Sequence, residues 1–342
     1  MLYVTTRDKY DAFTSHRALT QNCGPDGGFF RPFRLPKLEP QDIAAMAEKS
    51  FGQNVATILN LFFSSKLTGW DVAFCIGRNA VKLVPMHYRT WSVESWHGQT
   101  ETFHWITQQL ISQIYGSQCP VTDWSIIAVR IGVLFAAYGE LLKTGAAEPE
   151  KSMDVAMMTG DFTAPMAAWY AREMGLPVGT IICGCNENSG LWDLVYHGQL
   201  HTDGVAVDTG MPETDYVVPP ALERLIFETF GIDETNRYLD ICRRGRLYTL
   251  DEENVEQLHK GMFVAVVTKK RMADIILNVN RTNSYLMGPE AALAFGGLQD
   301  YRAKTGEIRP ALILSDGNPR RAADLISGIL KMTKSEFLSK MT

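Results

Sequence analysis

Short apolar runs alternate along this chain with longer segments whose apolar residues recur every three or four positions. A short apolar run is typical of a strand buried on both faces, and the longer spacing is typical of an amphipathic helix. In the second half of the chain this pattern predicts strands at 153–158, 179–185, 262–268 and 311–315, with helices at 163–177, 218–231, 269–283, 288–306 and 320–333. Strand, turn, helix and strand at this spacing make βαβ crossovers, so the pattern predicts an α/β fold with a mostly parallel sheet flanked by helices.

The first half carries the same kinds of signal, interrupted by one loop dense in Gly and Pro at 22–40. The pattern predicts helices at 40–63, 100–115 and 124–146, the last ended by Gly145, and an extended piece at 91–98. A chain of 342 residues is long enough for one large domain or two ordinary ones. We expect one compact unit, in which an N-terminal segment of residues 1–93 packs on an α/β core of residues 94–342.

Composition and charge narrow the class of protein. The net charge is −5, and no basic run or patch is present, which argues against a nucleic-acid partner. No apolar run approaches the length of a membrane span, and the charged N-terminus does not resemble a signal peptide. The six cysteines have no framework spacing, and the pair Cys183 and Cys185 lacks a neighbouring histidine, so neither disulfides nor a metal site are predicted. We expect a cytoplasmic protein without a membrane partner.

Polar residues follow three of the predicted strands, where ligands bind in open α/β sheets. The loop 159–165 opens a helix and can hold an anion at the helix N-terminus. The loops 185–190 and 314–319 offer Asn, Glu, Asp and Ser side chains. Ordinary turn chemistry explains any one of these loops, but three together predict a small-ligand site.

The order of several motifs resembles the threonine synthase family. The segments that carry the resemblance are 3–32, with its Pro-Asp-Gly-Gly loop, HGQTETFHW at 97–105, TDWSIIAVRIG at 122–132, TGDF at 159–162, CNEN at 185–188, ALERLIF at 221–227, YLMGPEAALAFGGLQDYR at 285–302, and SDGNP at 315–319. The resemblance implies fold type II of the pyridoxal-phosphate enzymes, the tryptophan synthase β-like fold, and a lyase-related role in amino-acid metabolism.

The first departure from the family is its catalytic lysine. HGQTETFHW resembles the family motif His-Gly-Pro-Thr-x-x-Phe-Lys-Asp, in which the lysine forms an aldimine with the cofactor. His104 and Trp105 stand where the family has that lysine and aspartate, and residues 94–115 contain no lysine. Imidazole does not form a stable aldimine, so we expect no covalently bound cofactor, and pyridoxal phosphate only without the covalent bond.

The second departure is a missing domain. In the family, a small domain that closes over the substrate lies between the lysine helix and the helix with the Asn-Trp-x-Arg motif. Here seven residues, 117–123, join the two predicted helices, too few for even one βαβ unit. We therefore expect the fold type II core with the small domain deleted and one open face.

The third departure concerns cofactor contacts. Asp161 and Thr163 replace residues of the family's phosphate loop, and Asp161 brings a negative charge close to where a phosphate would lie. Asp316, or Ser315 if the alignment slips by one residue, replaces the threonine that contacts the pyridine nitrogen. Glu290 and Asn318 replace family histidines.

These departures predict a non-catalytic threonine synthase-like pseudoenzyme that binds a small anionic ligand or a partner protein. Its partner can be a second copy or another chain, held by the face that the deletion exposes. The apolar helix 124–142 is the candidate surface, although burial in the core is the default explanation of its apolar sequence. The residues expected in the remnant pocket are Thr100, Gly160, Phe162, Thr163, Asn186, Asn188 and Ser315, together with His104, Asp161 and Asp316.

Four alternatives stay open. His104 can act as a general base oriented by Asp161 or Asp316, in an enzyme with changed chemistry. It can instead fill the space left by the lysine and cofactor, hydrogen-bonded to a loop, or join His97 and Glu101 in a metal site. Residual threonine synthase-type activity would need a partner subunit that supplies the missing domain.

Overall fold

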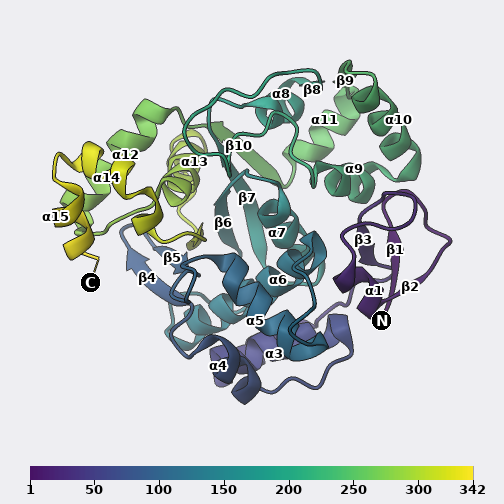
Figure 1. The fold of residues 1–342 in the computed structure, drawn as a ribbon, viewed down its shortest axis with the longest axis horizontal. Coiled ribbons are helices and arrows are strands. Elements are labelled where there is room, and N and C mark those ends of the chain that lie inside the picture. Colours follow the sequence, from purple (N-terminus) through teal and green to yellow (C-terminus); the bar gives the residue numbers. More distant parts are fainter. Residues whose placement is uncertain (342) are drawn as a thin grey trace.

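A six-stranded sheet forms the centre of the computed structural model, which describes residues 1–341 (Figure 1). Its strand order is β10-β7-β6-β11-β5-β4. All neighbouring pairs are parallel except β4 and β5, which are antiparallel. The strands are β4 (Lys82–Met86), β5 (Thr90–Glu94), β6 (Met153–Met158), β7 (Val178–Cys185), β10 (Met262–Val266) and β11 (Ala311–Ser315). The predicted α/β fold with a mostly parallel sheet is confirmed.

Successive side chains of the central strands enter two different hydrophobic clusters, because strand side chains alternate between the two faces of a sheet. Val155 and Met157 of β6 pack with α6 (Asp123–Lys143) and α7 (Thr163–Glu173). Ala156 of the same strand packs on the other face with α12 (Lys269–Asn283) and α13 (Pro289–Thr305). Helices on both faces bury nearly all of these strands, which explains their continuous apolar sequences.

The helix α6 lies in the larger cluster and is a long, strongly apolar helix. It has 21 residues, a length and composition sufficient to cross a membrane, so the expectation that no apolar run approaches a span is wrong. Inside the fold, 83% of the most apolar stretch of this helix is buried. The helix is therefore a core element, and the proposed use of residues 124–142 as a docking surface fails because the sheet and neighbouring helices already cover it.

Residues 116–122 join α5 (Phe103–Tyr115) directly to α6, in agreement with the short connection expected from the sequence. The expected helix at 40–63 is three pieces: α2 (Pro40–Ala44), the 3-10 helix η1 (Ala45–Glu48) and α3 (Phe51–Phe63). Ser50 causes the second break, because its side chain caps α3 by accepting a hydrogen bond from the Gln53 amide.

A small antiparallel sheet at the N-terminus has the order β2-β1-β3 and lies beside α1, on the opposite side of the molecule from the C-terminus (Figure 1). Tyr3 of β1 packs in the same cluster as α6, so the N-terminal residues share the main core. The expected boundary between residues 93 and 94 falls inside β5. The remaining elements are β1 (Leu2–Thr5), β2 (Phe13–Thr14), β3 (Phe30–Pro32), β8 (Gln199–His201), β9 (Leu247–Thr249), α1 (Ser15–Thr20), α4 (Gly69–Ile76), α8 (Gly190–His197), α9 (Leu222–Phe230), α10 (Ile232–Arg243), α11 (Glu252–His259), η2 (Pro319–Ala322), α14 (Ala323–Leu330) and α15 (Lys334–Ser339).

Candidate functional site

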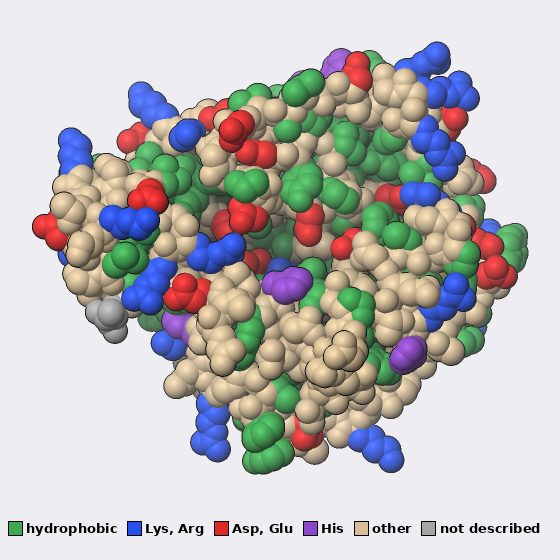
Figure 2. Space-filling model, viewed as in Figure 1, with side chains coloured by type: hydrophobic (Ala, Val, Ile, Leu, Met, Phe, Trp, Pro, Cys, Tyr) green, Lys and Arg blue, Asp and Glu red, His purple; other side chains and the backbone are tan. Residues whose placement is uncertain are grey.

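A cavity of about 520 Å³, here called the central cavity, opens where β6 and β11 end. The space-filling view shows a hollow near the middle of one face with acidic, basic and histidine side chains around it (Figure 2). The walls come from the first turn of α5, from α6, from the β6–α7 loop and from the segment before α9. Its charged and titratable lining residues are His104, Arg130, Asp161, Glu213, Tyr216, Glu290, Asp316 and Arg321. No lysine is among the described residues that line it.

The first turn of α5 is tied to the turn after β11. The Phe103 amide donates a hydrogen bond to the Asp316 carbonyl at 2.9 Å, and Thr102 forms a β-bridge with Gly317. Thr102 also caps α5, with its side-chain oxygen accepting from the Trp105 amide. These bonds place the next residue, His104, on the cavity wall.

Asp316 is one half of a mostly buried ion pair. Its Oδ1 lies 2.7 Å from Nη1 of Arg130 and also accepts a hydrogen bond from the Ser95 hydroxyl at 3.0 Å. The Arg130 guanidinium lies 3.9 Å from the centre of the Phe103 ring, a cation–π geometry. Asp316 therefore lines the cavity with a carboxylate that already has two partners.

Asp161 neutralises the N-terminus of α7. One carboxylate oxygen accepts from the Thr163 amide at 2.8 Å and from the Thr163 hydroxyl at 2.7 Å. Gly160 and Phe162 on either side have φ values of +48° and +75°, a left-handed turn that directs the Asp161 side chain back to the helix. The helix dipole attracts an anion at this position, and the chain supplies its own.

His104 is exposed at the cavity and does not fill it. Among residues 1–341, no hydrogen bond or ion pair joins its imidazole to another group, so the interpretation of His104 as a hydrogen-bonded plug is wrong. Asp161 and Asp316 bond elsewhere, and neither orients the imidazole.

His97 donates to or accepts from Glu94 at 2.7 Å instead of joining Glu101 and His104. No group of three or more His, Cys, Asp and Glu residues in the described part of the chain is placed to hold a metal ion.

Six of the ten expected site residues line the central cavity, and four do not. The six are Thr100, His104, Gly160, Asp161, Thr163 and Asp316. Phe162, Asn186, Asn188 and Ser315 are buried away from it. The Ser315 hydroxyl accepts a hydrogen bond from the Trp96 indole at 3.2 Å, which fixes the strand end instead of meeting a ligand.

Asn186 and Asn188 hold another part of the chain. The Asn186 side-chain amide donates to Asp215 at 2.6 Å and to Thr214 at 2.8 Å. The Asn188 side-chain amide donates to Asp215 at 3.0 Å, and its oxygen accepts from the Val207 amide at 2.8 Å. These bonds fasten residues 207–215 over the end of β7, so both amides serve the fold.

Four charged or phenolic residues of the site were not expected there: Arg130, Glu213, Tyr216 and Arg321. The sequence did contain a signal for Arg130, because this residue corresponds to the arginine of the family motif Asn-Trp-x-Arg. Glu213 had none, because the buried Asn186–Asp215 network brings it to the cavity from a segment without regular structure.

Glu290 also lines the cavity, and burial raises the pKa of its carboxyl from 4.5 to about 7, with Asp316 and Glu213 adding repulsion.

Residues 2–79 match the family model described as threonine synthase N terminus. The chain is 25% identical to threonine synthase of Pseudomonas aeruginosa over 182 residues, 53% of this chain and 38% of that enzyme. It is 24% identical to human threonine synthase-like 1 over 222 residues, 61% of this chain and 28% of that protein. The matched part thus spans well under half the length of these curated relatives.

Solved structures show the same fold. The pyridoxal-phosphate-bound threonine synthase of Brucella melitensis superposes with a TM-score of 0.83 at 19% identity, covering 96% of this chain and 91% of that one. The Escherichia coli threonine synthase superposes with a TM-score of 0.74 at 16% identity, covering 97% and 92% of the two chains. The predicted fold type II architecture is confirmed, and the chain is similar to threonine synthases in part of its sequence and in fold.

Proposed function

We propose that this protein is a threonine synthase-like pseudoenzyme, which binds a small ligand in the central cavity without Schiff-base chemistry. The observation that carries the proposal is the lining of the cavity, which contains no lysine among the described residues. An internal aldimine needs a primary amine, and His104 at the position of the family lysine has none.

The β6–α7 loop gives independent support. A cofactor phosphate bound in the family's manner would need the N-terminus of α7, where the Asp161 carboxylate already accepts the Thr163 amide and hydroxyl hydrogens. Two anions at one helix N-terminus repel each other. Glu213, Glu290 and Asp316 add further negative charge to the walls. The residues present do not fit covalently anchored pyridoxal phosphate, and they oppose its non-covalent binding by charge.

The surroundings of His104 support a pseudoenzyme better than an enzyme in which His104 acts as a general base. A catalytic histidine is held in one tautomer by a partner on its second nitrogen, and none of the described residues bonds to this imidazole. The connection 116–122 between α5 and α6 is too short to contain a domain that closes over the cavity. Because many catalytic sites must close to exclude water, the open cavity favours a binding role over a catalytic one.

The test is borohydride reduction of the purified protein in the presence of pyridoxal phosphate, followed by peptide mapping. We expect only scattered, substoichiometric labelling of exposed lysines, equal to that of the protein labelled after unfolding. The His104→Lys variant is the matched control, because it restores an amine at the same position. One adduct per wild-type chain on a single lysine, protected from surface reagents, would refute the proposal.

A further inference from the structure

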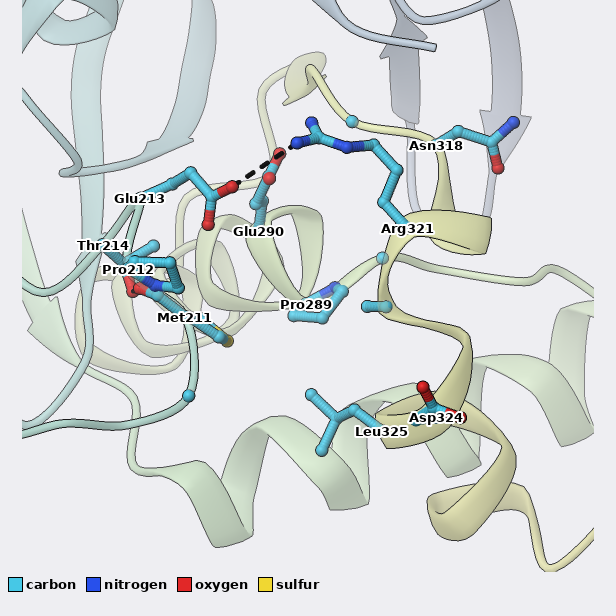
Figure 3. A pocket seen from close by; sticks show the side chains of 14 residues that line it. Met211, Pro212, Glu213, Thr214, Pro289, Glu290, Asn318, Arg321, Asp324 and Leu325 are labelled. Carbon is cyan, nitrogen blue, oxygen red and sulfur yellow. Dashed lines mark hydrogen bonds and ion pairs between the residues drawn. The ribbon is translucent and has the colours of Figure 1, made fainter. Parts of the chain in front are cut away.

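A second cavity of about 350 Å³ lies next to the central one and shares Glu213, Glu290 and Arg321 with it. We call it the side cavity. Its walls come from residues 210–214, the start of α13, and the segment from Gly317 to Leu325 (Figure 3). Met211, Pro289 and Leu325 give it an apolar part, and Glu290 lies between the two cavities.

The Glu290 carboxylate is the group in this wall that lacks a partner. No hydrogen bond or ion pair to it occurs among residues 1–341, and burial is the largest cause of its raised pKa. It keeps some accessible surface because it faces both cavities. Glu290 is the second residue of α13 and follows Pro289, and a Cβ placed on Gly317 would lie 3.1 Å from both of its carboxylate oxygens.

The charged groups around Glu290 are already engaged with one another. Arg130 of α6 pairs with Asp316 after β11 at 2.7 Å. Arg321 of η2 pairs with Glu213 at 3.5 Å, a loose and half-exposed contact that Figure 3 shows beside Glu290. Asp161 is bonded to Thr163, and His104 lies across the central cavity.

This arrangement leaves one carboxyl in a partly buried wall without a hydrogen bond or ion pair among the described residues. A carboxylate in such a place costs free energy unless a cation or a donor meets it. Glu213 and Asp316 raise the pKa of Glu290 and reinforce the preference for a cation, and the more weakly acting Arg321 and Arg130 offset part of this effect. A metal ion is not the fitting cation, because no cluster of three ligating side chains exists in the described chain.

We infer that the joined cavities bind a small primary amine, whose ammonium group meets Glu290 between Glu213 and Asp316 and whose alkyl part lies along Met211, Pro289 and Leu325. The inference rests on the proposed function, and it names the chemical class of the ligand. The charges around the site thus favour a cationic ligand over the anionic one expected from the sequence, since Glu213, Glu290 and Asp316 place carboxylates on three of the walls.

Binding of an ammonium group is coupled to a proton. The pKa of free Glu290 is raised to about 7, so below that pH the carboxyl is largely neutral. An ammonium ion stabilises the carboxylate, so binding at pH 6 expels the proton, and affinity rises as the pH passes through about 7.

The experiment is calorimetric titration of the wild-type protein with butylamine at pH 6.0 and 8.0, in buffers of different ionisation enthalpy. Butylamine stays cationic over this range. We expect about tenfold tighter binding at pH 8.0 and release of close to one proton per amine at pH 6.0. Butanol and butyrate, which match its size, should not bind.

Glu290→Gln keeps the shape and removes the charge, so it should weaken butylamine binding at least tenfold and abolish proton release. Glu256→Gln on α11, exposed and paired only with Lys260, is the matched control and should behave as wild type. The proton release of the wild-type protein tests the inference even if Glu290→Gln folds poorly.

Tighter binding of butyrate than of butylamine, competition by magnesium ions, or unchanged binding by a folded Glu290→Gln variant would overturn the inference. These outcomes leave the proposed function intact, because that proposal fails only if a lysine adduct forms with pyridoxal phosphate.

Discussion

The loops that follow β6 and β7 lie side by side at the same edge of the sheet and use their polar residues in different ways. After β6, Asp161 caps its own helix and still lines the central cavity. After β7, Asn186 and Asn188 are buried and bond to Asp215, almost thirty residues further along the chain. The first loop forms a wall of the cavity, and the second holds the segment that carries Glu213 to it.

The difference shows that a polar strand end can serve a ligand or the fold, depending on which distant segment covers it. Both loops look alike in sequence, because Asp and Asn are common in turns of either kind. The variants below separate the two uses, since a residue that holds the fold changes the free energy of unfolding and a residue that only faces the cavity does not.

The largest effect is expected for Asp316→Ala, because Asp316 both lines the cavity and stabilises the fold. Removing this carboxylate leaves the buried Arg130 guanidinium without its ion-pair partner. We expect a loss of about 3–4 kcal/mol in the free energy of unfolding, measured by urea denaturation. A loss within the error of the measurement would show that the pair is not a structural element of the cavity wall.

A smaller effect, with a pH dependence, is expected for Glu290→Gln. The unfolded carboxyl ionises near 4.5 and the folded one near 7, so between these values the folded state holds more protons and stability falls as the pH rises. Below the window both states are protonated, and above it the loss is complete. The stability of wild type relative to the variant should fall by on the order of 2 kcal/mol from pH 4.5 to 8. A pH-independent difference would contradict the buried, unpartnered carboxyl.

Asn186→Ala tests the β7 loop. It removes an amide that bonds to Thr214 and Asp215, and we expect a loss of about 1–2 kcal/mol in the free energy of unfolding. Asn278→Ala, on the exposed side of α12, is the matched control and should lose less than about 0.5 kcal/mol. Equal losses in the two variants would argue that the Asn186 network is not structural.

Asp161→Ala should have the smallest effect of the four. The change removes the two bonds to Thr163 at the start of α7, and caps of this kind contribute about 1 kcal/mol. Asp274→Ala, on an exposed face of α12, provides the control for removing a carboxylate. Denaturation by urea compares the two, and a stabilised Asp161→Ala protein would mean that Asp161 is strained for a ligand instead of capping the helix.

Most of the central sheet and most helices could be predicted from the sequence, because their burial leaves a local pattern, whereas the partly exposed strand β4 was not predicted. β6, β7, β10 and β11 lie within apolar runs, and α12 has the predicted bounds, since Thr268 caps one end. The N-terminal sheet and the β8–β9 pair were not predicted, because strands of two to four residues leave too little periodicity to detect.

The cavity could be predicted only in part. His104, Asp161 and Asp316 stand in motifs of the family, and the chain places all three on the cavity. Glu213 and Arg321 reach it through long-range packing, which no local pattern records. Asn186 and Ser315 were expected at the ligand and instead bond to Asp215 and Trp96, partners far away in sequence.

The central claim is that the cavity contains no lysine amine that could form an aldimine with pyridoxal phosphate. The most direct test is the near-visible absorption of the wild-type protein after incubation with pyridoxal phosphate and removal of the excess. The account predicts only the protein band, unchanged by borohydride. A band at the edge of the visible range that persists through desalting and disappears on reduction would show a lysine aldimine, and would contradict it.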